Sequence, residues 1–309
     1  MEIKQQELLL SKNCLYLFMG LHVFSAAGTF VFSKAAAVSF ANPMVLTCSR
    51  GLGAAVILFL LSGWKIPKPD FTLKEWLWIL CLGVLLVPLN QYCFLKGLER
   101  TVPGHSALLY AMTPLGVLLL SSVRTGKVPS IKKLAGIFIA FSGVMIILRP
   151  WESGVRASEL RAGDLWLIVA VSCWVVYTVL ASDICKRKNT LTVTAWSLIS
   201  GVFVMLPMAA GQMMTFDFSI VSTPGWFGLG YMILITSIVM MMLWNLLLKY
   251  LTPVQVAITT NAQPPATMLL AAVTAAVGLL PGNQDLGPMF IMGMVLSLSG
   301  VIIIQKAGN

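Results

Sequence analysis

Long apolar runs separated by short polar segments are the main pattern along this chain of 309 residues. A helix needs about 20 mostly apolar residues to cross the ~30 Å hydrocarbon core of a bilayer. The pattern predicts ten such helices, over residues 14–35, 43–63, 74–95, 103–123, 132–149, 163–183, 191–211, 225–248, 252–279 and 287–305. We therefore expect an all-α integral membrane protein. The longest connection, residues 150–162, predicts a boundary between two domains, 1–150 and 151–309.

Composition supports a membrane protein and argues against other classes. Apolar residues make up 58% of the chain and charged residues only 10%, whereas soluble proteins have about 25% charged residues. The net charge of +10 comes from lysines and arginines in short loops, with no basic patch for nucleic acid. Fourteen of them fall on one predicted side and six on the other. The positive-inside rule then places both termini in the cytoplasm, and a bacterial inner membrane fits a retained first helix.

The two halves repeat each other. The segment TVPGHSALLYAMTP, residues 101–114, aligns with LTPVQVAITTNAQP, residues 251–264, and GIFIAFSGVMII, residues 136–147, aligns with GMVLSLSGVIII, residues 293–304. Five helices per repeat is an odd number, so the second copy should enter the membrane from the opposite side. We expect two inverted five-helix repeats, a design that recurs in transporters and that channels or membrane enzymes can share.

In order and in duplicate, these segments resemble the ten-helix EamA-type transporters of the drug/metabolite transporter superfamily. The resemblance is carried by SAAGTFVFSKAA, NPMVLTCSRG, FLKGL, SALLYAMTPLGVLLLSSVRTGK and GIFIAFSGVMII, and it covers nearly the whole chain. It implies a secondary carrier for small metabolites, often amino acids, without fixing the substrate. The Gly-Glu pair that usually follows the fourth and ninth helices is missing, because the chain has Gly126–Lys127 and LLPGNQD there. No role of that glutamate is carried over.

Polar side chains inside the apolar runs are the candidates for solute binding. A polar group in hydrocarbon needs a partner or a water-filled cavity. Aromatic faces in such a cavity would favour flat or partly apolar solutes. The substrate-binding candidates are Asn90, Gln91, Tyr110, Trp174, Tyr177, Trp244, Asn245, Asn261 and Gln263. The alternative for each is structural, as an interhelical hydrogen bond worth about 0.6 kcal/mol or as core packing.

Prolines inside predicted helices mark possible kinks. Each removes a backbone donor and frees a carbonyl, and broken helices near a repeat interface point to a binding site. The candidates for hinges are Pro88, Pro114, Pro264 and Pro265. A static bend that serves packing is the alternative.

Charged and titrating groups within the membrane are few. His22 in the first helix is a candidate for proton coupling, since histidine titrates near neutral pH. Arg50 in the second helix either snorkels and caps carbonyls or attracts a carboxylate. All eleven acidic residues fall in loops or at helix ends. This distribution favours neutral or zwitterionic solutes over obligate cations.

These patterns favour a secondary transporter that exports amino acids, aromatic ones among them, or amphipathic drugs by alternating access. A channel-like facilitator, or a membrane enzyme or assembly factor, is the alternative. No enzymatic signature, metal spacing or nucleotide-binding loop is present in the sequence, so we expect no enzyme and no cofactor. The expected partners are the solute, the lipid bilayer and protons as the coupling ion, with the chain a monomer or a homodimer.

Overall fold

A computed structural model describes residues 12–62, 69–99, 106, 109–149, 157–276 and 287–307, and in these residues it is helical throughout, without strands. Eight helices of the described part are long and apolar enough to cross a membrane. Large apolar side chains such as Phe24, Phe59 and Phe203 lie on the outer surface, more than 60% exposed, as lipid-facing groups do. The expected all-α membrane fold is confirmed.

In the described part of the first half, to residue 149, seven helical segments have defined bounds. They are α1 (Lys12–Phe40), α2 (Pro43–Ser62), α3 (Leu73–Val84), the π-helix η1 (Leu85–Gln91), α4 (Tyr92–Glu99), α6 (Thr113–Thr125) and α7 (Ile131–Leu148). The segments α3, η1 and α4 form one continuous span. A capping box begins this span, because Thr72 and Glu75 satisfy each other's backbone N–H groups.

The second half repeats this order. It contains α8 (Ala157–Cys185), α9 (Thr190–Thr215), the 3₁₀ turn η2 (Phe218–Ile220), α10 (Thr223–Tyr231), the π-helix η3 (Met232–Met240), α11 (Met241–Tyr250), α12 (Pro253–Ala257), the 3₁₀ segment η4 (Ile258–Ala262), α13 (Gln263–Ala276) and α14 (Pro288–Lys306). The segments α10, η3 and α11 form one span, so the third and the eighth helices each contain a π-helical segment.

The fourth and ninth helices, predicted over 103–123 and 252–279, are each interrupted within their described residues. In the fourth, a turn at Met112 precedes α6; in the ninth, η4 ends at Ala262, just before α13. A proline follows each break by two residues. Prolines are favoured at the start of a helix, where their missing N–H leaves no bond unmade. The carbonyl of Asn261, which the N–H at position 265 would otherwise bond, accepts a hydrogen bond from Ser297 Oγ of α14 instead.

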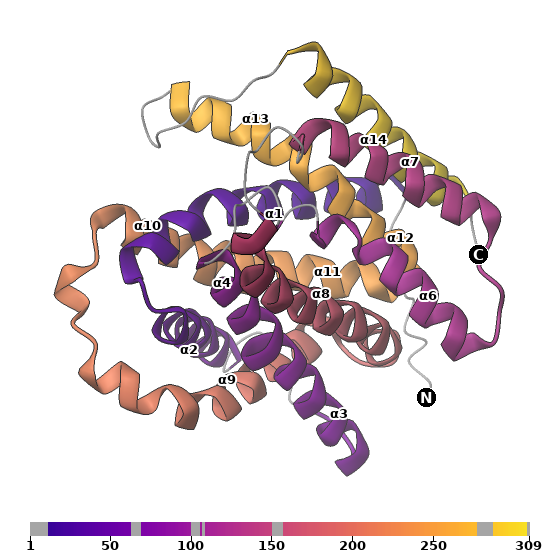
Figure 1. Cartoon of the computed structure of the whole chain (residues 1–309). Coiled ribbons are helices and arrows are strands. Elements are labelled where there is room, and N and C mark those ends of the chain that lie inside the picture. The colour runs from indigo at the N-terminus through magenta and orange to yellow at the C-terminus, as the bar shows by residue number, and fades with distance from the viewer. Residues whose placement is uncertain are drawn as a thin grey trace.

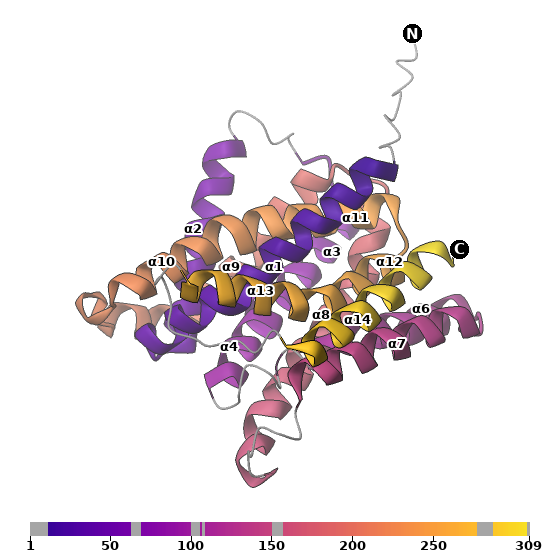
Figure 2. The same cartoon turned by 90° about the horizontal axis from the view of Figure 1, so that it is seen from above.

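The two fifth helices, α7 and α14, lie side by side and antiparallel (Figures 1 and 2). Gly136 faces Gly300 and Gly143 faces Gly293, so the two helices run in opposite directions. Equivalent helices of the two halves that run in opposite directions establish that the repeats are inverted.

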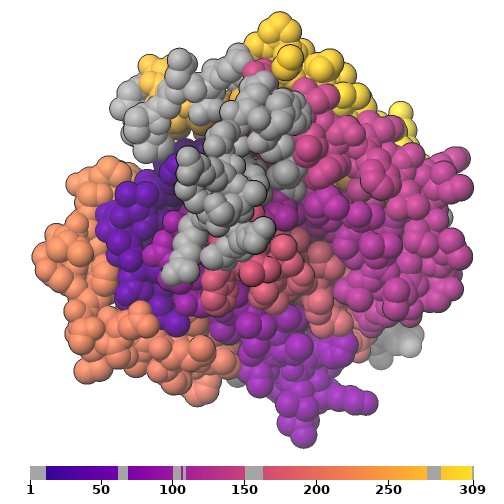
Figure 3. Space-filling model, viewed as in Figure 1, coloured from indigo at the N-terminus to yellow at the C-terminus, as the bar shows by residue number. Residues whose placement is uncertain are grey.

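Helices of each half pack against helices of the other half. In the first half, α1 packs on α10 and α13 of the second half, while α8 of the second half packs on α4 and α6 of the first. One apolar core includes residues of both halves. On the face shown in Figure 3 the colours of the two halves alternate around the molecule. Neither half therefore has a complete core of its own.

Candidate functional site

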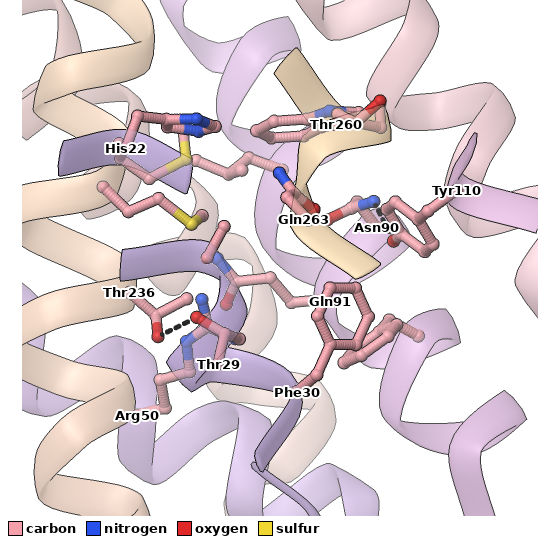
Figure 4. A pocket seen from close by; sticks show the side chains of 16 residues that line it. His22, Thr29, Phe30, Arg50, Asn90, Gln91, Tyr110, Thr236, Thr260 and Gln263 are labelled. Carbon is pink, nitrogen blue, oxygen red and sulfur yellow. Dashed lines mark hydrogen bonds between the residues drawn. The ribbon is translucent and has the colours of Figure 1, made fainter. Parts of the chain in front are cut away.

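A cavity with several polar groups in a mostly apolar wall lies at the junction of the two halves, lined by seven of the predicted spans. It leaves about 80 Å³ for the centres of water-sized molecules, more than the ~15 Å³ that a single water needs. Its walls are formed by His22, Ala26, Thr29, Phe30, Arg50, Leu86, Asn90, Gln91, Phe94, Tyr110, Trp174, Thr236, Met240, Met241, Thr260 and Gln263. Figure 4 shows His22 and Thr260 at one end of the view, and Arg50 with Thr29 and Thr236 at the other.

Irregular backbone supplies much of this lining. The π-segment η1 contributes Leu86, Asn90 and Gln91, and η3 contributes Thr236 and Met240. Isolated π turns inside α-helices occur frequently at functional sites. Proline explains η1, because Pro88 lies within it and cannot donate a backbone hydrogen bond.

Five of the nine predicted substrate-binding residues line the cavity. They are Asn90, Gln91, Tyr110, Trp174 and Gln263. The Asn90 Nδ2 atom donates to Tyr110 Oη at 3.0 Å and to the Ala170 carbonyl at 2.8 Å. These bonds join the third helix to the fourth and the sixth. The amide of Asn90 is thus held in place beside the cavity.

The other four predicted residues do not line it. Tyr177 and Asn245 hydrogen-bond each other, and Asn245 Nδ2 also donates to Thr194 Oγ1 at 2.9 Å. Both side chains are fully buried. Trp244 packs behind the wall, with its ring centroid 5.0 Å from that of His22 and 4.8 Å from that of Trp174. Asn261 is fully buried and accepts from Thr260.

The four proline hinge candidates lie near the cavity but outside its lining. Pro88 is buried in η1, Pro114 lies in the first turn of α6, and Pro264 and Pro265 lie in the first turn of α13. None of these prolines lines the cavity. Each lies close in sequence to a lining residue, since Asn90, Tyr110 and Gln263 do line it. A hinge role for them stays a prediction.

His22 and Arg50 both reach the cavity. His22 is 1% exposed, and its Nδ1 has no hydrogen-bond partner within the protein. Its ring lies against Trp244. Arg50 is 4% exposed and donates from Nε to Ser237 Oγ at 2.7 Å. The other histidine of the sequence, His105, lies outside the described residues.

The sequence analysis missed Thr29, Thr236 and Phe94 of the cavity lining. Thr29 Oγ1 donates to the Ser25 carbonyl, so the 2.7 Å bond between Thr29 and Thr236 takes its proton from Thr236. The rings of Phe30, Phe94 and Tyr110 meet edge to face, with centroids 5.6 to 6.4 Å apart. A signal was present in α1, where the lining positions 22, 26, 29 and 30 have the spacing of one helix face.

The two asparagines predict different effects on mutation. Asn245→Ala leaves the buried Tyr177 hydroxyl without its partner and removes one bond from Thr194, whose hydroxyl still donates to the Thr190 carbonyl. We expect a loss of about 1–3 kcal/mol in stability. Asn90→Ala removes two bonds between helices and should lower the melting temperature as well. Because Asn90 lines the cavity, this variant should also lower the solute flux of the folded protein by about two- to tenfold, the worth of one hydrogen bond. Melting curves, and flux measured per folded protein, check both variants. Reduced flux in folded Asn245→Ala together with normal flux in folded Asn90→Ala would contradict the placement of the cavity.

A bundle of membrane-spanning helices, built as two inverted halves around a central cavity, is a recurring design of membrane transporters. Comparison with known proteins gives the family. The EamA-like transporter family matches the chain twice, over residues 14–149 and 161–305, and the chain belongs to this family.

Relatives of known sequence are transporters too. The chain is 25% identical over 296 residues to the uncharacterized transporter YyaM of Bacillus subtilis (strain 168), covering 95% of this chain and 96% of that protein. It is 25% identical over 236 residues to the uncharacterized inner membrane transporter YedA of Escherichia coli (strain K12), covering 74% and 72%. A solved crystal structure matches with a TM-score of 0.73 at 16% identity, covering 96% of this chain and 98% of that one. The structural match concerns the fold alone.

Proposed function

We propose that this protein is a secondary carrier that moves small neutral or zwitterionic metabolites, such as amino acids or amphipathic drugs, by alternating access, with export as the net direction. The observation that carries the proposal is the position of the cavity, at the junction of two inverted repeats and lined by residues of both. Rocking one half against the other would open such a cavity to each side in turn.

The broken helices support this mechanism. The fourth and ninth helices break at corresponding positions, Met112 and Ala262, and the residues Tyr110, Thr260 and Gln263 beside the breaks line the cavity. A helix that is already interrupted can change direction at the break without losing further backbone hydrogen bonds. The two breaks thus provide matching points of bending in both halves.

Counterflow in proteoliposomes tests the proposal. Vesicles are loaded with an excess of unlabelled solute, chosen by a thermal-shift screen of amino acids, nucleosides and amphipathic drugs, and labelled solute is added outside. A carrier accumulates label transiently above its equilibrium level, because each return step carries label inward. A channel-like facilitator equilibrates the label without overshoot, and this outcome would overturn alternating access. Label that does not enter at all for any solute bound in the screen would contradict transport itself.

We extend the proposal to proton coupling at His22, the one imidazole among the cavity residues. Its unpartnered Nδ1 is available to take up a proton once the cavity opens to water and hydrates the ring. We expect His22→Gln to abolish the pH dependence of flux between pH 5.5 and 8 while leaving solute binding measurable. A variant that keeps the wild-type pH profile would exclude His22 as the coupling group.

A further inference from the structure

Arg50 is a buried cation without a counter-charge. It is the one buried side chain of Lys, Arg, Asp or Glu in the described part of the chain, with 4% of its surface exposed. Its Nε donates to Ser237 Oγ. Within the described ranges no carboxylate oxygen lies within ion-pair distance of the guanidinium. The four N–H donors of the two terminal amino groups therefore have no anion to bond.

Snorkelling does not account for this arginine. Arg50 comes seven residues after Pro43, the first residue of α2, and so lies about 10 Å along the helix. A snorkelling side chain leaves its charged head at the membrane surface, whereas Arg50 is buried and lines the central cavity. A buried charge without a partner costs several kcal/mol. The burial of the Arg50 charge is therefore explained better by an anion that binds from solution than by contacts within the protein.

The groups around Arg50 are polar but neutral. Thr29 and Thr236 already bond each other. Gln91 is 3% exposed, and neither its Oε1 nor its Nε2 has a hydrogen-bond partner within the protein. No aspartate or glutamate lines the cavity. The cavity thus offers one fixed positive charge, with an unpaired amide as a second polar contact.

The geometry of arginine selects among anions. Its planar fork matches both oxygens of a carboxylate. A single guanidinium balances one negative charge, and no second Lys or Arg among the lining residues would balance the second charge of a phosphate. His22, the lining residue that could gain a charge, lies at the other end of the view from Arg50 in Figure 4. Beyond the polar end, the rings of Phe30, Phe94 and Tyr110 form an apolar wall. A solute with a carboxylate and an apolar or aromatic group would fit both the Arg50 end of the cavity and its apolar wall.

We infer that Arg50 binds the carboxylate of the transported solute, with Gln91 as a neighbouring polar contact. Solutes without a carboxylate are then not transported. This inference rests on the proposed transport function and narrows its substrate class to small solutes that carry one carboxylate. The amide of the same solute keeps its size and body but loses the negative charge. It should therefore lose the bond to Arg50.

Matched acid and amide pairs test the inference on the wild-type protein. The probes are phenylalanine with phenylalaninamide, leucine with leucinamide, and phenylacetate with phenylacetamide, with uridine and phenyl phosphate added. Each is measured as a competitor of labelled uptake and by its thermal shift. We expect the acid of at least one pair to bind about 10- to 100-fold more tightly than its amide, the worth of a hydrogen bond to a charged group. Amides or uridine that bind as well as the acids, or preference for phenyl phosphate, would overturn the inference.

Three variants connect the preference to the residue. Arg50→Gln should bring the ratio of acid to amide close to one, and Arg50→Lys should keep part of it. Arg124→Gln, a control on an arginine that is paired with Asp183 at the surface, should leave the ratio unchanged. A purely structural role of Arg50 would lower the yield or melting temperature without changing the ratio, and that result would refute the inference. If Arg50→Gln does not fold, the acid and amide pairs measured on the wild-type protein still test the inference.

The experiments distinguish a failure of the proposed carrier function from a failure of the carboxylate site at Arg50. Flux without counterflow would remove alternating access, while the acid-to-amide ratio would still measure the role of Arg50. Counterflow of uridine that is insensitive to Arg50→Gln would keep the carrier and remove the carboxylate site. If no acid in the panel moves or shifts the melting curve, both ideas are contradicted for this class of solute.

Discussion

Replacing Gly143 with leucine should prevent the two fifth helices from packing together. A Cβ atom at this position would lie 2.4 Å from the backbone nitrogen of Ser297 and 2.5 Å from the carbonyl oxygen of Gly293. Both are backbone atoms, so no side chain can move aside and α14 itself must shift. We expect a loss of stability of at least about 3 kcal/mol, at the upper end for overpacked sites, seen as a lower melting temperature and loss of the monodisperse peak in detergent.

Gly211→Leu is the matched control for this change. Gly211 lies in α9, and a Cβ there would meet no atom within 4 Å. This variant should keep the wild-type melting temperature and elution profile. Gly300→Leu should resemble Gly143→Leu, because its Cβ would lie 2.4 Å from the Gly136 carbonyl oxygen. Wild-type stability in both α7–α14 variants would show that these helices do not approach so closely.

Filling the cavity from α1 should abolish transport without unfolding the protein. Ala26 is 4% exposed and lines the cavity, so the phenyl ring of Ala26→Phe would occupy space that a solute needs. We expect flux in proteoliposomes to fall by more than tenfold, together with loss of the thermal shift caused by the solute. Val38→Phe is the control on the same helix, since Val38 is 72% exposed and faces outward. Normal flux in a folded Ala26→Phe protein would show that solutes take another route.

Apolar periodicity was sufficient to predict most of the helices, because a bilayer requires a nearly fixed length of apolar chain. The repeated segments 136–147 and 293–304 share glycines at positions 136, 143, 293 and 300, and the structure shows that these glycines face one another across the two halves. The odd number of helices per repeat predicted the inversion that this antiparallel pair confirms. The orientation with both termini in the cytoplasm stays a prediction.

The site was harder to predict, because polarity alone does not show which face of a helix a side chain occupies. Asn90 and Asn245 look equivalent in sequence, yet Asn90 reaches the cavity and Asn245 bonds Tyr177 and Thr194 behind it. A small error in the predicted rotation of each helix about its axis is enough to exchange these roles, and the π-segments η1 and η3 shift the register of just these helices. The threonines 29 and 236 were missed because a lone threonine in an apolar helix usually bonds its own backbone.

Access to Met240 from the two sides of the membrane tests the central claim most directly. Met240 lies in η3 and lines the cavity. Its replacement by cysteine, in a background from which the six native cysteines have been removed, provides one reactive site there. A membrane-impermeant thiol reagent should label it in right-side-out vesicles and, separately, in inside-out vesicles, with saturating solute protecting it in both. Labelling from one side only, or labelling that solute does not slow, would contradict a single solute cavity opened alternately by two inverted halves.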